Sequence, residues 1–338
     1  MPSESHREWV KQRVESLRGG ADQLKSIAPD QYNEFGPWSA LKLIIHAATV
    51  NMYTKVISDY KDDFFYIDAL AGSGVSVYGE EDDCFLGSPI LAAKDAAEPF
   101  TKMYFIEEDP NNAEALRRRL DAAYNGNSIE TTNPQDYQVY EGDAHKKLDE
   151  VIDDMWNIAH QNPSGPNFNH LTFIDNQGLT VGWKEGIEKV APKPTGDLLI
   201  NFSSSDIVRS AHHEPSRDAM NKFYGGGMWD IDDKSKRNLR KKYCDRLTGV
   251  EKPIKVVANV DSGTKSYEYD MIYATRETTH GSGYIDAVDY VREFIEAVDG
   301  ADVEDMLKVI RGDRTTMEEF LPDDEQEDGD DQASLGDF

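Results

Sequence analysis

The segment from Asp68 to Gly74 carries residue types that could hold a small polar ligand. It reads Asp-Ala-Leu-Ala-Gly-Ser-Gly and follows the apolar run FFYI, which is typical of a buried strand. Ligands of open α/β sheets bind outside the carboxyl ends of the strands, and glycines there let the backbone approach a ligand closely. We therefore expect Asp68, Ala71, Gly72 and Gly74 to contact a bound ligand.

The spacing of these glycines narrows the kind of ligand. The dinucleotide fingerprint needs a third glycine three positions after Gly74, and this chain has Val77 there. This departure disfavours a dinucleotide cofactor and favours a nucleoside ligand without a pyrophosphate. Gly72 and Gly74 would also suit a tight turn with no ligand, and that alternative stays open.

Two more acids end the next predicted strands. Glu107 ends MYFIE, where a carboxylate can accept protons from both ribose hydroxyls, and Asp143 ends QVYEGD, where it could accept from an adenine amino group. Polar residues are common at strand ends, and Glu108 and Asp109 are equally acidic neighbours. Three such features at successive strand ends nevertheless favour a cofactor site.

The sequence Asp175-Asn-Gln-Gly ends a fourth predicted strand, LTFID. An acid at this place can accept a proton or a hydrogen bond from a nucleophile, so Asp175 and Asn176 are the candidate catalytic residues. A turn built from Asn176 and Gly178 explains the same residues equally well.

Asn201, at the end of the fifth predicted strand, and Arg209 are the candidate substrate contacts. Arg209 would suit a phosphate or a carboxylate, although the acid-rich composition favours a surface ion pair. For His212 and His213 we expect a loop and not a metal site, because adjacent side chains of a regular element point in different directions and no second His or Cys cluster lies nearby in the sequence. The glycines before Trp229 indicate a hinge, a lid or an interface.

Strands and helices alternate along the chain. The apolar patterns predict strands at 64–68, 103–107, 138–143, 171–175 and 197–202, and helices at 38–59, 88–97, 111–123, 144–156 and 183–190. We expect Ser88 to cap the second of these helices, with Pro89 at its first position. Strands at 254–260 and 267–275 then form a hairpin, and a helix follows at 284–298.

This order predicts an α/β fold with five parallel strands, an antiparallel hairpin and helices on both faces, which is the Rossmann-like plan of a class I methyltransferase. Residues 1–37 are expected to form a helical N-terminal extension. Residues 38–300 are expected to form the main domain, with a helical insertion near 216–250. Residues 301–338 form a C-terminal segment that ends in a disordered acidic tail.

The charge of the chain is extreme, because 36 Lys and Arg oppose 64 Asp and Glu, giving 36 − 64 = −28. Such a chain would repel nucleic acid in dilute buffer. Dispersed acids also fit a halophilic protein, for which molar salt screens charge within about 3 Å. We favour this interpretation, under which the net charge says little about the substrate. Two distant cysteines and no long apolar run predict a cytoplasmic protein without a membrane span.

An ordered set of short motifs over about residues 38–295 resembles the three-Cys-motif partner protein family, TcmP. The motifs are WSALK, YIDALAGSG, GSP, YFIEED, GDA, FIDNQG, LLINF, Arg209, the glycines before Trp229, and YDMIYATRETTHGSG. The resemblance implies an S-adenosyl-L-methionine (SAM)-dependent methyltransferase that acts with a three-cysteine protein of radical-SAM or phage-related type. The three cysteines of the family name belong to that partner.

Two departures from the family pattern bear on activity. Leu70 replaces the usual Phe, and Asp175-Asn-Gln-Gly lacks the proline of the family's Asp-Pro-x-Gly. Neither Asp175-Asn-Gln-Gly nor the family's Asp-Pro-x-Gly is the Asp/Asn-Pro-Pro-Tyr motif of base amino methyltransferases, so that motif gives no support for N6-adenine or N4-cytosine methylation. Nucleic acid is our expected acceptor class. A scaffold subunit that binds the three-cysteine protein without catalysis is the main alternative, and a nucleotide-binding oxidoreductase is disfavoured by Val77.

Overall fold

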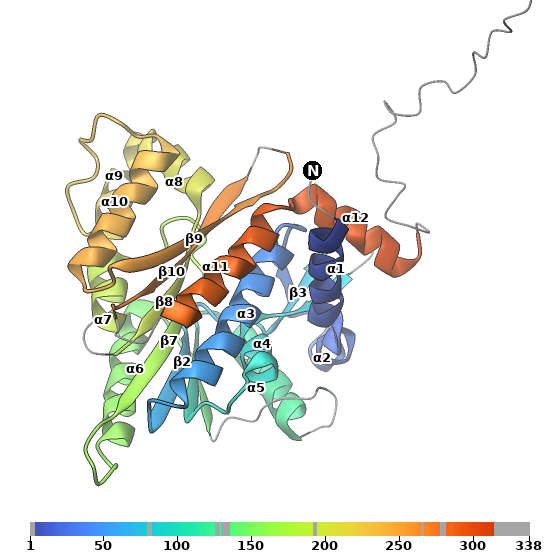
Figure 1. The fold of residues 1–338 in the computed structure, drawn as a ribbon, viewed down its shortest axis with the longest axis horizontal. Coiled ribbons are helices and arrows are strands. Elements are labelled where there is room, and N and C mark those ends of the chain that lie inside the picture. Colours follow the sequence, from blue (N-terminus) through green and yellow to red (C-terminus); the bar gives the residue numbers. More distant parts are fainter. Residues whose placement is uncertain are drawn as a thin grey trace, which may run out of the picture.

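A seven-stranded sheet lies at the centre of the computed structural model, which describes residues 4–313 apart from 80–82, 126–128, 130–135, 192–194, 265–266 and 278–281. Its strands are β2 (Asp63–Asp68), β5 (Lys102–Glu107), β6 (Tyr137–Glu141), β7 (Phe168–Ile174), β8 (Asp197–Phe202), β9 (Ile254–Asp261) and β10 (Glu268–Thr275). They run in the order β6-β5-β2-β7-β8-β10-β9. Figure 1 labels β2, β7, β8, β10 and β9 of this sheet.

The pairing of the strands confirms the predicted fold class. β6, β5, β2, β7 and β8 are parallel neighbours, whereas β10 is antiparallel to both β8 and β9. The order reverses between β2 and β7, because the chain fills β5 and β6 on one side before it returns. Ligands of such sheets bind at this reversal, outside the carboxyl ends of the strands.

Helices cover both faces of the sheet. One face carries α3 (Ser39–Ile57), α4 (Ser88–Asp95), α5 (Pro110–Asn125) and α11 (Ser282–Glu296). The other carries α6 (Ala144–Ala159), a π-helical turn (Trp183–Ile187), α7 (Glu188–Val190), α8 (Ser204–Ala211), α9 (Arg217–Tyr224) and α10 (Lys236–Gly249). α6 shows why these segments are helical: Leu148, Val151 and Met155 recur every three or four residues and are buried.

The N-terminal extension contains a strand that the sequence did not reveal. After α1 (Glu4–Arg18) and α2 (Ala21–Ile27), the two-residue β1 (Asn33–Glu34) pairs with β3 (Val75–Tyr78), which pairs with β4 (Asp83–Leu86). α12 (Gly300–Arg311) packs against α1. The predicted acidic tail lies outside the described residues. None of the described helices is long and apolar enough to cross a membrane.

The start of α4 differs from the prediction. Gly87, not Ser88, occupies the N-cap, with Pro89 in the first turn. The Ser88 hydroxyl donates to Asp68 Oδ2 at 2.6 Å instead of capping the helix. Ser88 therefore joins the helix to the end of β2.

Arg119 of α5 ties the N-terminal extension to the glycine-containing loop after β2. Its fully buried guanidinium donates to the carbonyls of Leu24, Ala28 and Gln31 at 2.7–3.0 Å and to that of Ser73 at 2.7 Å. Burial lowers the pKa of Arg119 to about 10, and the charge is met by carbonyl dipoles around the end of α2.

We predict that Arg119→Met lowers the free energy of unfolding by about 3 kcal/mol or more, because four carbonyls lose their buried donor. The measurement is guanidinium chloride unfolding followed by circular dichroism. Arg118→Met is the matched control, because Arg118 is the exposed neighbour of Arg119 and, among the described residues, donates to Ile27 O alone. This variant should lose less than about 1 kcal/mol of unfolding free energy. Equal losses in the two variants would contradict this account.

Candidate functional site

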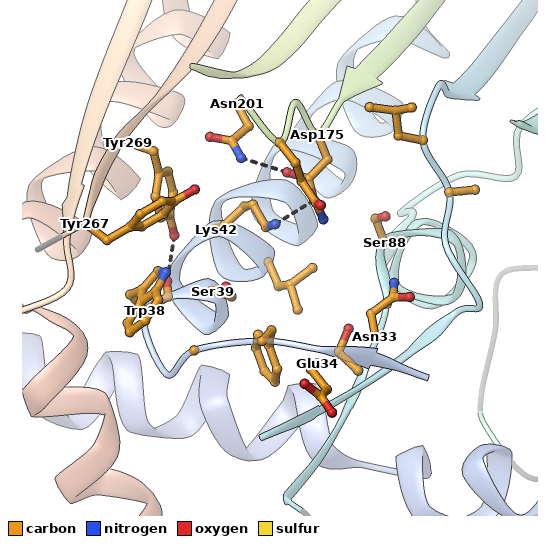
Figure 2. Close-up of a pocket in the computed structure, with 18 of the residues that line it drawn as sticks. Asn33, Glu34, Trp38, Ser39, Lys42, Ser88, Asp175, Asn201, Tyr267 and Tyr269 are labelled. Atoms are coloured by element: carbon orange, nitrogen blue, oxygen red, sulfur yellow. Dashed lines mark hydrogen bonds and ion pairs between the residues drawn. The ribbon is translucent and has the colours of Figure 1, made fainter. Parts of the chain in front are cut away.

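A cavity of about 350 Å³ opens at the carboxyl ends of β2, β7 and β8. Its volume lies in the range of small-ligand sites. Figure 2 shows how residues of different elements surround it: Asn33 and Glu34 from β1, Trp38 beside α3, Lys42 from α3, Asp175 after β7, Asn201 from β8, and Tyr267 and Tyr269 at the start of β10. The cavity therefore lies where the strand order reverses.

Asp175 is held between two partners inside this cavity. Lys42 Nζ lies 2.5 Å from Asp175 Oδ2, and Asn201 Nδ2 donates to Asp175 Oδ1 at 2.8 Å (Figure 2). Lys42 and Asp175 are 15% and 18% exposed, so their charges are paired but reachable from the cavity. The site thus presents a fixed carboxylate that can accept a proton or a hydrogen bond.

Asn201 leaves a buried acceptor unused. Its Nδ2 donates to both Asp175 Oδ1 and the Asn176 carbonyl, which fixes the orientation of the amide. Its Oδ1 is buried and has no hydrogen-bond partner in the described part of the chain. Because such an orphaned acceptor costs free energy, it suits a ligand that brings an N–H or O–H.

Asn176 has a different position from the one predicted. It is fully buried, it is not among the described residues that line the cavity, and its Oδ1 accepts from Val181 N at 2.9 Å. Asn176 holds the loop after β7 in place, in agreement with the turn alternative. Of the two predicted catalytic residues, the structure brings only Asp175 to the cavity.

The two glycines of the loop serve packing within the chain. Gly72 has φ +64° and Gly74 has φ +84°, so both favour glycine. A Cβ on Gly72 would lie 2.2 Å from Asn33 Nδ2, and one on Gly74 would lie 2.9 Å from Leu116 Cδ1. Asn33 therefore covers Gly72, where a close ligand approach was expected. Ala71 lines the cavity.

Asp68 lies beneath the cavity floor. It is fully buried, and its Oδ1 accepts from Leu70 N at 3.3 Å while its Oδ2 accepts from the hydroxyls of Ser88 and Tyr66. Tyr66 OH lies 2.7 Å from His46 Nε2. Leu70 and Ser88 line the cavity, so Asp68 positions two lining residues from behind.

Burial is the largest cause of the pKa shifts of Asp68 and His46, which Tyr66 connects by hydrogen bonds. It raises the pKa of Asp68 to about 7, although the hydrogen bond from Ser88 acts in the opposite direction. It also lowers the pKa of His46 to about 3, so the imidazole is neutral near pH 7.

Glu107 and Asp143 lie outside the described lining of the cavity. Glu107 Oε2 accepts from Gly72 N and its Oε1 from Asp109 N, each at 2.8 Å. Each carboxylate oxygen keeps a lone pair, because it can accept two hydrogen bonds. Asp143 is the N-cap of α6 and accepts from Lys146 N.

Arg209 lies apart from Asn201, its predicted companion in substrate binding. Its side chain is 71% exposed and pairs with Asp206 at 3.0 Å, as the surface alternative predicts. Asp206 itself lines the cavity, which places Arg209 at the rim.

Sequence reasoning assigned no site role to Lys42 or to the aromatic residues Trp38, Tyr267 and Tyr269. The rings of Trp38 and Tyr267 lie 5.7 Å apart, and Tyr269 OH donates to the Trp38 carbonyl at 2.6 Å. The alternation of Tyr267 and Tyr269 at the start of a strand was the available signal, because residues i and i+2 share one face.

No family model and no curated protein matches the chain. Protein LPL1258 from Legionella pneumophila has a TM-score of 0.44 at 12% identity, with 75% of this chain and 92% of that chain covered. Trm1 from Pyrococcus horikoshii, solved with S-adenosyl-L-methionine, has a TM-score of 0.40 at 14% identity, covering 75% and 58%. The resemblance to the three-Cys-motif partner family stays a prediction.

Asp68 should make stability depend on pH in a defined direction. Its folded pKa of about 7 exceeds the ordinary 3.8. Between about pH 4 and 7 the folded protein therefore keeps a proton that the unfolded chain has already released. The stabilisation is complete below this window and is lost as pH rises through about 7.

We predict that wild type loses about 1.4 kcal/mol of unfolding free energy per pH unit, relative to Asp68→Asn, as pH rises from about 4 to 7. The variant stays neutral throughout, and contributions from His46 cancel in the difference. Denaturant unfolding of both proteins at several pH values measures it. A difference that does not change with pH would show that Asp68 is ionised in the fold.

Proposed function

We propose that the protein is a SAM-dependent methyltransferase. One observation carries the proposal: the Glu107 carboxylate is fixed on the Gly72 amide at the ends of β2 and β5, beside a cavity that leads to Asp175. In an open α/β sheet of this order, an acid at the end of the second strand is the group that accepts ribose hydroxyls.

The charges of the cavity fit a cationic cofactor. The described charged residues that line it are Lys42 and three acids, Glu34, Asp175 and Asp206. This excess of carboxylates suits the positive sulfonium of SAM, and Glu107 retains lone pairs for hydroxyl donors. The free Oδ1 of Asn201 offers an acceptor for the group that is to be methylated.

SAM, when bound, supplies an electrophilic methyl group on a sulfonium. Asp175 is the residue that can accept the proton of the nucleophile, and Lys42 and Asn201 hold its two oxygens in fixed directions. The Oδ1 of Asn201 orients the nucleophile through its N–H or O–H. Methyl transfer needs in-line positioning above all, and these contacts fix the orientation of the acceptor.

The second candidate function is a methyltransferase-like scaffold that binds a three-cysteine protein. The observation that favours it is Asn33, which lines the cavity and covers Gly72, the residue whose amide donates to Glu107. Under this alternative the N-terminal segment closes the cofactor site permanently. SAM binding distinguishes the two functions, because only the enzyme requires it.

We predict that SAM binds in about 2 M KCl and that Glu107→Ala weakens this binding about tenfold or more, since two hydroxyl contacts to a charged acceptor are lost. Isothermal titration measures the affinity, and molar salt screens the self-repulsion of a chain with net charge −28.

Glu108→Ala is the matched control, because Glu108 is an exposed neighbour of the same charge. It should bind SAM like the wild type. The enzyme proposal fails if folded wild-type protein shows no binding, and the placement of the ribose fails if the two variants bind equally well.

A further inference from the structure

One helix stands apart from the acidic remainder of the protein. α10 holds six of the 36 basic residues and a single acid, Asp245, within 14 residues. Its net charge is therefore +5, whereas the other residues of the chain together carry −28 − 5 = −33. A local excess of Lys and Arg on one helix marks a surface that attracts polyanions.

The basic residues of α10 have two different roles. Leu239, Tyr243 and Leu247 face the core, and two basic residues are used inward, where Lys236 pairs with Glu268 at 2.7 Å and Arg240 pairs with Asp270 at 2.6 Å. A third, Arg246, stacks over the ring of Trp183.

The remaining basic residues lie on the outer face of the helix. Arg237 and Lys241 are exposed and Lys242 is half-buried. Arg237 and Lys242 have no ion pair within the described residues, and Lys241 pairs only with the exposed Asp245. This outer face therefore keeps charge available for a partner.

The helix begins near the edge of the sheet at which the cavity opens, on the opposite face from α3. Lys236, in its first turn, holds Glu268, which stands between the lining residues Tyr267 and Tyr269. α10 also packs against α8, where Arg209 is exposed and pairs with the lining residue Asp206. Figure 1 shows α8, α9 and α10 together at one end of the molecule, away from α1 and α12. Arg209 and the exposed basic residues of α10 thus lie on two helices that pack against each other.

We propose that the outer face of α10, with Arg209 at the rim, docks the phosphate backbone of a single-stranded nucleic acid. This inference rests on the proposed function in one respect, because it makes a base of that strand the group that enters the cavity. The phosphates stay on Arg209, Arg237, Lys241 and Lys242. The base is uncharged and can lie against the rings of Trp38 and Tyr267.

The cavity distinguishes a nucleic acid from an acidic protein. Glu34, Asp175 and Asp206 would repel the carboxylates of an acidic peptide, whereas a neutral base meets no such cost. The free Oδ1 of Asn201 is an acceptor that suits the N–H of a base. The basic outer face of α10 therefore suits the anionic backbone of the strand, and the acidic cavity admits its neutral base.

The test uses fluorescein-labelled 20-nucleotide single strands of RNA and of DNA with one mixed sequence, and labelled poly-glutamate as the acidic polypeptide. Anisotropy gives the affinities of the full chain from about 0.1 to 1 M KCl. The variant is Arg237→Glu/Lys241→Glu. The control is Lys11→Glu/Lys55→Glu, which changes the net charge by the same amount on α1 and α3. Like the variant, it combines one lysine that has an ion pair, Lys11, with one basic residue that has none among the described residues, Lys55.

We expect RNA or DNA to bind the wild type and the control alike, and the α10 variant to bind about tenfold or more weakly. Its logarithmic salt slope should fall by about 1.4, since each phosphate contact on a single strand contributes about 0.7. Preference for RNA or for DNA identifies the source of the strand, and either supports the proposal. No binding of either strand, an equal loss in the control, or tighter binding of poly-glutamate would overturn it.

SAM titration of the same samples separates the two proposals. SAM binding without nucleic-acid binding would overturn the docking surface alone. Nucleic-acid binding through α10 without SAM binding would support the surface and overturn the methyltransferase proposal.

Discussion

The buried guanidinium of Arg119 is the point where the N-terminal segment joins the loop after β2. Its bonds to Ala28 and Gln31 fix the chain just before β1, and its bond to Ser73 fixes the loop between the two glycines. Tyr269 holds the other end of the same segment through the Trp38 carbonyl. One wall of the cavity is therefore a segment pinned at both ends, and its shape depends on these buried bonds.

Charge is distributed in a way that net charge conceals. The cavity carries more carboxylates than cations, which suits a sulfonium, while α10 concentrates Lys and Arg on the outside. The value of −28 taken alone would suggest that nucleic acid is repelled. That argument treats the charge as uniform, but a strand would meet mainly the local field of the helix, because screening limits interactions to about 10 Å.

The sheet and its helices could be predicted because a parallel sheet buried on both faces leaves continuous apolar runs, such as those of β2 and β8. β1 could not, since two residues carry no periodicity. Lys42 escaped notice because a lysine on a helix usually faces solvent, and only the fold places Asp175 opposite it. Asp68 was predicted as a ligand contact, but Ser88, twenty residues later, covers its carboxylate.

The central claim is that the carboxyl ends of β2, β5 and β7 form one cofactor and acceptor site. A crystal structure with S-adenosylhomocysteine bound tests this most directly. The account predicts the ribose hydroxyls on Glu107 and the sulfur on the side of the cavity that faces Asp175, with Asn33 displaced from Gly72. The product bound elsewhere, or absent from crystals soaked at saturating concentration with Asn33 still on Gly72, would contradict it.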